Sequence, residues 1–226
     1  MARHRYRDRT EAGEVLADGL ADALAGVLGD QSAIVLALPR GGVPVAVPVA
    51  RRLAAPLGLM LVRKLGVPGR PELAMGAIAR TGDTVDVVRN ERVITEAGVD
   101  EAAFERVRRH EEGALAERAE RYGAPSPWAA PQAARGRTVV LVDDGLATGM
   151  TALAAVAAAR ALQPRRVVMA APVGSPIAVD LVGRGADLVV CPLAPPGFAA
   201  VSQWYDTFDQ LSDAEVLDAL ARARLP

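Results

Sequence analysis

The sequence predicts an α/β fold with a doubly wound, mainly parallel sheet flanked by helices. Short apolar runs of strand length alternate along the chain with Ala-rich or amphipathic runs of helix length. The clearest unit is residues 138–162, where TVVLV leads through two acids and a small-residue turn into an Ala-rich run. Right-handed crossovers would place such helices on both faces of the sheet. With 226 residues and 51% hydrophobic content, the chain can bury a full core as a single domain, residues 1–226.

The N-terminal part is predicted to follow this alternation. Residues 10–27 place apolar side chains at helical spacing, and AIVLAL at residues 33–38 has the length and composition of a buried strand. Pro44 suits the first turn of the next helix, where a missing N–H costs little. The expected elements are, in order, a solvated lead-in at 6–9, a helix at 10–27, a strand at 33–38, a helix at 45–53 and a strand at 57–62. Packing of the lead-in over a site is the less favoured alternative.

The middle of the chain predicts an insertion, residues 65–97, instead of another strand–helix unit. Gly and Pro are frequent at residues 65–71, so we expect a mobile loop there that could close over a site. Short strands at 74–79 and 84–88 flank a Thr-Gly-Asp turn, and residues 90–95 are interpreted as an edge strand.

The remaining elements continue to the C-terminus. The mixed charges of residues 100–121 recur at i,i+4 spacing, which indicates a long solvated helix. Ser212 and Glu215 form a capping box at the start of the last helix. The expected elements are a helix at 100–121, a Pro/Ala connector at 123–135, a strand at 166–171, a helix at 176–183, a strand at 187–191, a proline-rich excursion at 192–198 and a helix at 213–223.

Composition excludes several classes of function. The formal net charge of -1 gives no basic field for nucleic acid. The single cysteine, Cys191, rules out an intrachain disulfide framework and fits a reducing compartment. No apolar run reaches the roughly 18 to 20 residues of a membrane span, and the charged start lacks the apolar core of a signal peptide. We therefore expect a soluble, cytoplasmic protein. His4 and His110 lack the spacing of zinc ligands.

One basic residue differs from all the others. Lys64 is a lysine in a chain whose other basic residues are arginine. Such a bias most simply reflects codon usage. Against this background, Lys64 indicates a place where a compact ammonium is used, with chance survival as the alternative.

Three polar segments are predicted to meet at one edge of the sheet. Ligands of open α/β sheets bind beyond the carboxyl ends of the strands, where the strand order reverses. If the strands at 33–38 and 139–142 are neighbours there, PRGG at 39–42, Arg63 with Lys64, and DDGLATGMT at 143–151 share one crevice. Backbone N–H groups at a helix N-terminus bind phosphate, and carboxylates accept hydrogen bonds from sugar hydroxyls. The sequence thus predicts a site for a sugar with phosphates at both ends.

The segment VVLVDDGLATGMT closely resembles the phosphoribosyl-pyrophosphate (PRPP) binding motif of the type I phosphoribosyltransferases. It has four hydrophobic residues, two acids and a small loop that ends in Thr-Gly-x-Thr. A strand followed by PRGG stands at the correct earlier position, and the resemblance covers most of residues 30–192. Neither a Walker lysine nor G-x-G-x-x-G follows a strand, so P-loop nucleotide hydrolysis and dinucleotide binding are poorly supported.

The resemblance implies a role for each matching residue. Asp143 and Asp144 would hold the ribose hydroxyls, and Lys64 would act on the leaving group, which makes these three the candidate catalytic residues. Mg2+ would be bound through the ligand, with Asp143 or Asp144 as the protein group nearest to it. The implied PRPP-binding residues are Arg40, Gly41, Gly42, Asp143, Asp144, Ala147, Thr148, Gly149 and Thr151. The family also implies a cis peptide in the PRGG loop, which we place at Pro39–Arg40.

The acceptor is the least transferable part of the resemblance. Many purine-using relatives have an acid where this chain has Ala147. A purine acceptor is therefore less favoured, but this difference does not identify uracil as the acceptor. In this family the acceptor normally contacts a segment outside the sheet, called the hood. The candidate hood, residues 192–211, offers Phe198 and Tyr205 to cover a planar base, and Trp204 is interpreted as core.

Two functions from different classes follow. The first is an enzyme that transfers phosphoribosyl from PRPP to a nitrogenous base and releases pyrophosphate, as part of nucleotide metabolism. The second is a non-catalytic regulatory protein that binds PRPP. Lys64 and the two phosphate loops favour the enzyme. Relatives are often dimeric, so a homodimer remains open.

Overall fold

The central sheet is parallel, as predicted, and its strands lie in the order β2-β1-β6-β7-β8. The computed structural model describes residues 5–25, 33–81, 84–122 and 126–223. The strands of this sheet are β1 (Ala33–Ala37), β2 (Leu57–Leu59), β6 (Thr138–Val142), β7 (Arg166–Ala170) and β8 (Leu188–Val190). β1 and β6 pair in register from Ala33 with Thr138 to Ala37 with Val142. The two strands that precede PRGG and DDGLATG are therefore neighbours, and both segments leave the same edge of the sheet.

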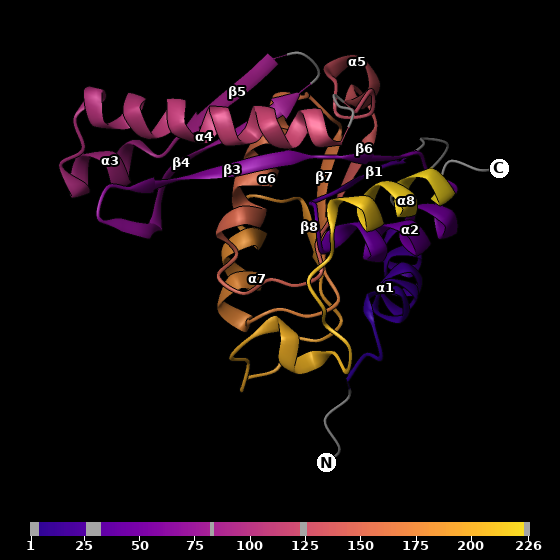
Figure 1. Ribbon diagram of the computed structural model, residues 1–226. Coiled ribbons are helices and arrows are strands. Elements are labelled where there is room, and N and C mark those ends of the chain that lie inside the picture. Colours follow the sequence, from indigo (N-terminus) through magenta and orange to yellow (C-terminus); the bar gives the residue numbers. More distant parts are fainter. Residues whose placement is uncertain (1–4, 26–32, 82–83, 123–125, 224–226) are drawn as a thin grey trace.

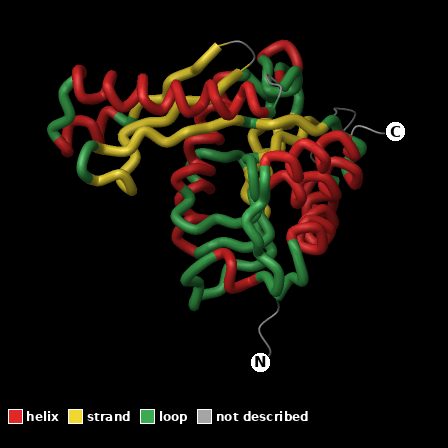
Figure 2. The backbone as a smooth tube through the Cα atoms, viewed as in Figure 1, coloured by secondary structure: helices red, strands yellow, loops and turns green. Residues whose placement is uncertain are grey.

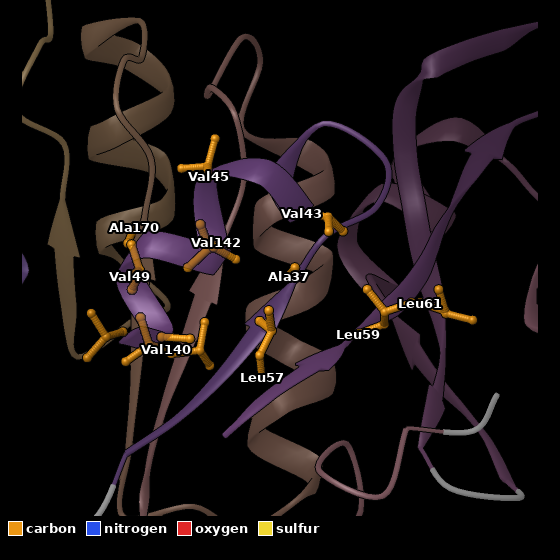
Figure 3. Packing of buried hydrophobic residues seen from close by; sticks show 14 of the residues in the cluster. Ala37, Val43, Val45, Val49, Leu57, Leu59, Leu61, Val140, Val142 and Ala170 are labelled. Atoms are coloured by element: carbon orange, nitrogen blue, oxygen red, sulfur yellow. The ribbon is translucent and has the colours of Figure 1, made fainter. Parts of the chain in front are cut away.

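Helices cover both faces of this sheet (Figure 1). On one side lie α1 (Arg9–Leu24), α2 (Gly42–Arg52) and α8 (Asp213–Ala223), and on the other lie α6 (Met150–Ala161) and α7 (Pro176–Gly183). Side chains of a strand alternate between faces, so each strand contributes to two cores. Val140 and Val142 pack with Val43 and Val49 of α2 (Figure 3), whereas Val139 and Leu141 pack in the cluster on the α6 side.

The strand predicted at 57–62 is in fact two strands that belong to different sheets. After β2, the chain forms an antiparallel sheet of β3 (Leu61–Val67), β4 (Arg70–Thr81) and β5 (Thr84–Arg89). The prediction of a mobile loop at 65–71 is wrong. β3 and β4 continue through most of this segment to a tight turn at Gly69, whose φ is +75°. Leu65 and Val67 are buried on alternate positions, so strand periodicity persists despite the Gly and Pro content.

The edge strand expected at 90–95 is also wrong. Residues Glu91–Ala97 form helix α3, whose N-cap Asn90 accepts the N–H of Val93 and whose end is set by Gly98 in the left-handed conformation. The long charged helix is confirmed as α4 (Glu101–Arg121), and the connector contains the short helix α5 (Pro131–Ala134). Figure 1 shows α4 lying along the antiparallel sheet. Phe104 and Leu115 of α4 belong to the same core cluster as Leu65 and Met75 of that sheet.

The lead-in at residues 6–9 is only partly solvated, which corrects the favoured prediction: Tyr6 and Arg9 pack against other segments, whereas the Arg7 side chain is 70% exposed. Tyr6 is 2% exposed, forms a parallel bridge with Tyr205, and donates its hydroxyl to the Pro172 carbonyl at 3.0 Å. The candidate hood contains a short 3-10 helix, η1 (Val201–Trp204), and Trp204 is buried as expected of core. Figure 2 shows this loop-rich region beside the N-terminal segment. The last residues of the helix predicted at 10–27 lie outside the described residues.

Within the described part of the chain, no helix combines the length and apolar composition needed to cross a bilayer.

Candidate functional site

The PRGG loop and the acidic pair are pressed against each other. The Pro39–Arg40 peptide bond is cis, as predicted. A Cβ on Gly41 would lie 1.9 Å from Oδ2 of Asp144, and one on Gly42 would lie 2.4 Å from the Val142 carbonyl oxygen. Only glycine lets the two loops approach this closely. The pairing of β1 with β6 therefore brings the two halves of the predicted site into direct contact.

The two carboxylates are adjacent and partly buried. Oδ1 of Asp143 accepts the N–H of Asp144 at 2.9 Å. Burial raises the pKa of Asp143 well above its usual value, and the neighbouring charge of Asp144 raises it further. Burial also raises the pKa of Asp144, although the nearby Arg9 guanidinium opposes this shift. The site thus holds two carboxyl groups whose ionised forms lack full compensation from the protein.

Arg9 also belongs to this site, although its segment, residues 6–9, was expected over a site only as the less favoured alternative and no role was predicted for Arg9 itself. Its Nε donates to Oδ2 of Asp144 at 2.9 Å, and the two side chains are 11% and 16% exposed. Its guanidinium also lies 3.9 Å from the centre of the Phe208 ring and donates to the Asp209 carbonyl. Arg9 therefore joins the N-terminal segment, the acidic pair and the segment before α8. No motif marks it, because its partners lie far away in the sequence.

The aromatic residues proposed for the acceptor occupy different environments. Tyr205 is 2% exposed and donates its hydroxyl to the Asp144 carbonyl at 2.6 Å, so its ring presents little surface to a base. Phe198 is half-buried and packs against the cluster around Tyr6 and Trp204. Tyr205 therefore holds the end of β6, and its proposed contact with a base gains no support from this placement.

The small loop after the acids offers free backbone donors. Gly149 has a φ of +77° and forms the N-cap of α6, where a Cβ would meet Ala178 at 3.2 Å. Among the residues that the structure describes, the N–H groups of Ala147, Thr148, Gly149 and Thr151 have no hydrogen-bond acceptor. Free N–H groups at a helix N-terminus favour an anion. This loop has the properties expected of a phosphate site.

Lys64 lies on the other side of the PRGG loop, in β3. Its ammonium pairs with Glu72 of β4 at 2.8 Å, and it lines a cavity of about 700 Å³ together with Pro39 and Thr151. Arg40 instead lines a cavity of about 440 Å³ with Arg9 and Asp144, and its guanidinium lies 3.9 Å from Asp213. The cis peptide therefore stands between two cavities, and the predicted site residues are divided between their walls.

The protein groups suit a divalent cation that is bound mainly by a ligand. No group of three or more His, Cys, Asp or Glu in the described ranges could hold a metal by itself. Magnesium commonly uses one or two carboxylates together with substrate phosphates. Asp143 and Asp144 supply such a pair, and a cation would offset the burial that raises the pKa of both.

The structure is a doubly wound α/β domain with acidic and glycine-rich segments at one edge of its sheet, and comparison with known proteins identifies its family. The chain belongs to the phosphoribosyl transferase domain family, whose model matches residues 8–182. The chain is 44% identical over 218 residues to proteins from two strains of Mycobacterium tuberculosis that are provisionally described as phosphoribosyl transferases. These alignments cover 96% of this chain and 47% of each relative, so the chain spans about half the length of these curated relatives.

A solved structure is similar over nearly its whole length. The crystal structure of TT1426 from Thermus thermophilus has a TM-score of 0.83 and 41% identity to this chain. The match covers 96% of this chain and 98% of that one. The arrangement of the sheet, the antiparallel insertion and the flanking helices is thus shared with a protein of related sequence.

Proposed function

We propose that this chain transfers the 5-phosphoribosyl group from PRPP to a nitrogenous acceptor and releases pyrophosphate. The observation that carries the proposal is the contact between Gly41, beside the cis peptide, and the carboxylate of Asp144. This contact supports the proposal, because a donor that carries both pyrophosphate and ribose requires a pyrophosphate-binding loop beside ribose-binding carboxylates.

Each part of the donor has a matching group in this arrangement. The free N–H groups of residues 147–149 and Thr151 would bind the 5′-phosphate at the start of α6. Asp143 and Asp144 would accept hydrogen bonds from the ribose 2′- and 3′-hydroxyls. The backbone of the PRGG loop and the Arg40 side chain would bind the pyrophosphate.

The reaction needs charge stabilisation more than a protein nucleophile. As the bond from C1′ to the pyrophosphate oxygen breaks, positive charge develops on the ribose and negative charge on the leaving group. The two carboxylates favour the former, and Lys64 with Arg40 favours the latter. The acceptor nitrogen then bonds to C1′ and its proton is lost to solvent. When bound, Mg2+ would neutralise charge on the pyrophosphate.

The glycine contact gives a direct test of the donor site. Gly41→Ala should weaken PRPP binding at least about tenfold, because the new methyl group must displace the Asp144 carboxylate or the loop. Isothermal titration with PRPP and Mg2+ measures this effect. Gly113→Ala is the matched control, since a Cβ at Gly113 of α4 meets open space, and it should leave the affinity unchanged. Equal affinity in the two variants would contradict the proposed contact between loop and donor.

Pyrophosphate release from PRPP, Mg2+ and a panel of nitrogenous bases tests the activity. We expect release that depends on at least one base and disappears in the double variant Asp143→Asn with Asp144→Asn. Clear PRPP binding without release for any base would instead support the regulatory, non-catalytic alternative. Absence of both binding and release would overturn the proposed function.

A further inference from the structure

The cavity beside Lys64 has a second wall that the donor does not require. This wall is formed by one face of α4, which contributes Arg106, His110 and Arg118. From the donor side, Pro39 and Thr151 line the same cavity. Its volume of about 700 Å³ is typical of a small-molecule site and far exceeds the space that a pyrophosphate group fills. The helix expected to be only a solvated flank therefore faces the candidate active site.

The ion pairs of α4 distinguish the arginines at the cavity from the others. Arg108 pairs with Glu105 and Glu112, Arg109 pairs with Glu105, and Arg121 pairs with Glu117 and Asp213. None of these three arginines lines the cavity.

Arg106 and Arg118 show the opposite pattern. Both line the cavity, and among the described residues neither has an ion-pair partner. In a helix rich in acidic residues, the arginines left without a carboxylate are the two that face the cavity. Unpaired guanidinium groups beside a concave surface favour an anionic ligand, since they can bind carboxylate or phosphate through two parallel hydrogen bonds.

The other charges of the cavity do not cancel this preference. Arg63 pairs with Glu111, which bridges β3 to α4 and fixes the distance between the two walls. Glu111 is the one carboxylate among the described lining residues, against the basic side chains of Arg63, Lys64, Arg106 and Arg118. Lys64 is already assigned to the leaving group, so the α4 arginines are available for a different anion.

We propose that Arg106 and Arg118 bind an acidic group, a carboxylate or a phosphate monoester, on the acceptor. The inference rests on the proposed transfer reaction and adds the chemical class of its second substrate. An acceptor held in this way by α4 directs its nitrogen toward Lys64 and the donor loops. It also agrees with the burial of Tyr205, which leaves little aromatic surface on the hood side.

The test compares acceptors that differ only in the acidic group. Equilibrium binding to the PRPP-loaded protein is measured for uracil and orotate, for nicotinamide and nicotinate, and for ethanolamine and phosphoethanolamine. We expect at least one acidic member to bind at least about tenfold more tightly than the partner that lacks the acidic group. The carboxylate and phosphate pairs distinguish the two sources of the anion.

The double variant Arg106→Gln with Arg118→Gln should abolish this preference and leave the dissociation constant of PRPP within about twofold of the wild-type value. Arg109→Gln is the matched control, because Arg109 belongs to the same helix but lies off the cavity, and it should retain the preference. Both changes replace side chains on the surface of the helix, and the far-ultraviolet circular dichroism of each variant verifies its folding.

Three outcomes would overturn the inference. Equal binding of acidic and neutral acceptors by the wild-type protein would remove its basis. A loss of PRPP or pyrophosphate affinity in the double variant as large as the loss of acceptor affinity would assign the arginines to the donor. A wild-type protein that does not bind PRPP would overturn the proposed function together with this inference, whereas the first two outcomes leave the proposed function intact.

Discussion

Asp143→Asn should make the unliganded protein more stable while it weakens PRPP binding by about 10- to 100-fold. The loss of affinity follows from replacing a charged acceptor, since a hydrogen bond to a charged group contributes about 1.5–3 kcal/mol. The gain in stability follows from the raised pKa of Asp143, because the folded protein holds this partly buried carboxylate beside a second one. Asparagine keeps the oxygen that accepts the Asp144 N–H and removes the charge.

The expected gain is about 1 kcal/mol in the free energy of unfolding, or about 2–4 °C in the melting temperature of a chain of this size. Thermal unfolding without ligand and titration with PRPP and Mg2+ measure the two effects. Asp187→Asn is a control whose expected change in stability has the opposite sign. Asp187 pairs with Arg160, which lowers its pKa, so its replacement should destabilise the fold and leave PRPP affinity unchanged.

The pH dependence of stability independently checks whether Asp143→Asn stabilises the unliganded protein. A group whose pKa is raised in the folded state binds more protons there than in the unfolded chain, so its contribution to stability is lost as pH rises. For Asp143 the loss begins near the unfolded value of about 4 and continues through the raised folded value. The difference in stability between Asp143→Asn and wild type should therefore grow with pH across this window. A difference that stays constant would contradict the buried-charge explanation.

Lys64→Ala should lower turnover about 100-fold and change PRPP affinity only modestly. An ammonium that acts on the leaving group contributes mainly as the bond to pyrophosphate breaks, and removal of one such group typically costs about 10²–10³ in rate. Single-turnover pyrophosphate release measures the rate, and titration with PRPP measures affinity. The protein should remain folded, because the Glu72 side chain that pairs with Lys64 is 80% exposed and an exposed ion pair contributes little to stability.

Glu72→Gln distinguishes the role of Lys64 in the reaction from the role of its ion pair with Glu72. It removes the partner of Lys64 and keeps the ammonium at the cavity, so turnover should stay within about threefold of the wild-type rate. Equal losses in Lys64→Ala and Glu72→Gln would show that the ion pair has a structural role only. Unchanged turnover in Lys64→Ala would exclude Lys64 from the reaction.

The sequence predicted those parts of the molecule that local patterns determine. The apolar runs of β1 and β6 mark buried strands, and the residues after them belong to one edge because neighbouring parallel strands end together. The close approach of Gly41 to Asp144 follows from that pairing. Between Asn90 and Gly98, β-branched residues favoured the prediction of a strand. The structure instead forms helix α3, which Asn90 and Gly98 cap at its two ends.

Features that depend on distant partners could not be read from the sequence. Gly and Pro at residues 65–71 indicated a loop, although burial of Leu65 and Val67 against the core extends the strands. Arg9 contacts Asp144 and Phe208 because the N-terminal segment pairs beside Tyr205, and no short motif encodes such a contact. The same holds for α4. Its charge pattern alone indicates a solvated helix, and only the structure shows that one of its faces lines a cavity.

The central claim is that the PRGG loop and the acidic pair form one PRPP site, and PRPP binding tests it most directly. Isothermal titration of the wild-type protein with PRPP and Mg2+ should give saturable binding at one site per chain. The double variant Asp143→Asn with Asp144→Asn should lose that binding although it remains folded. A wild-type protein that gives no binding heat and no thermal stabilisation by PRPP, or a double variant that binds PRPP as tightly as the wild-type protein, would contradict the claim.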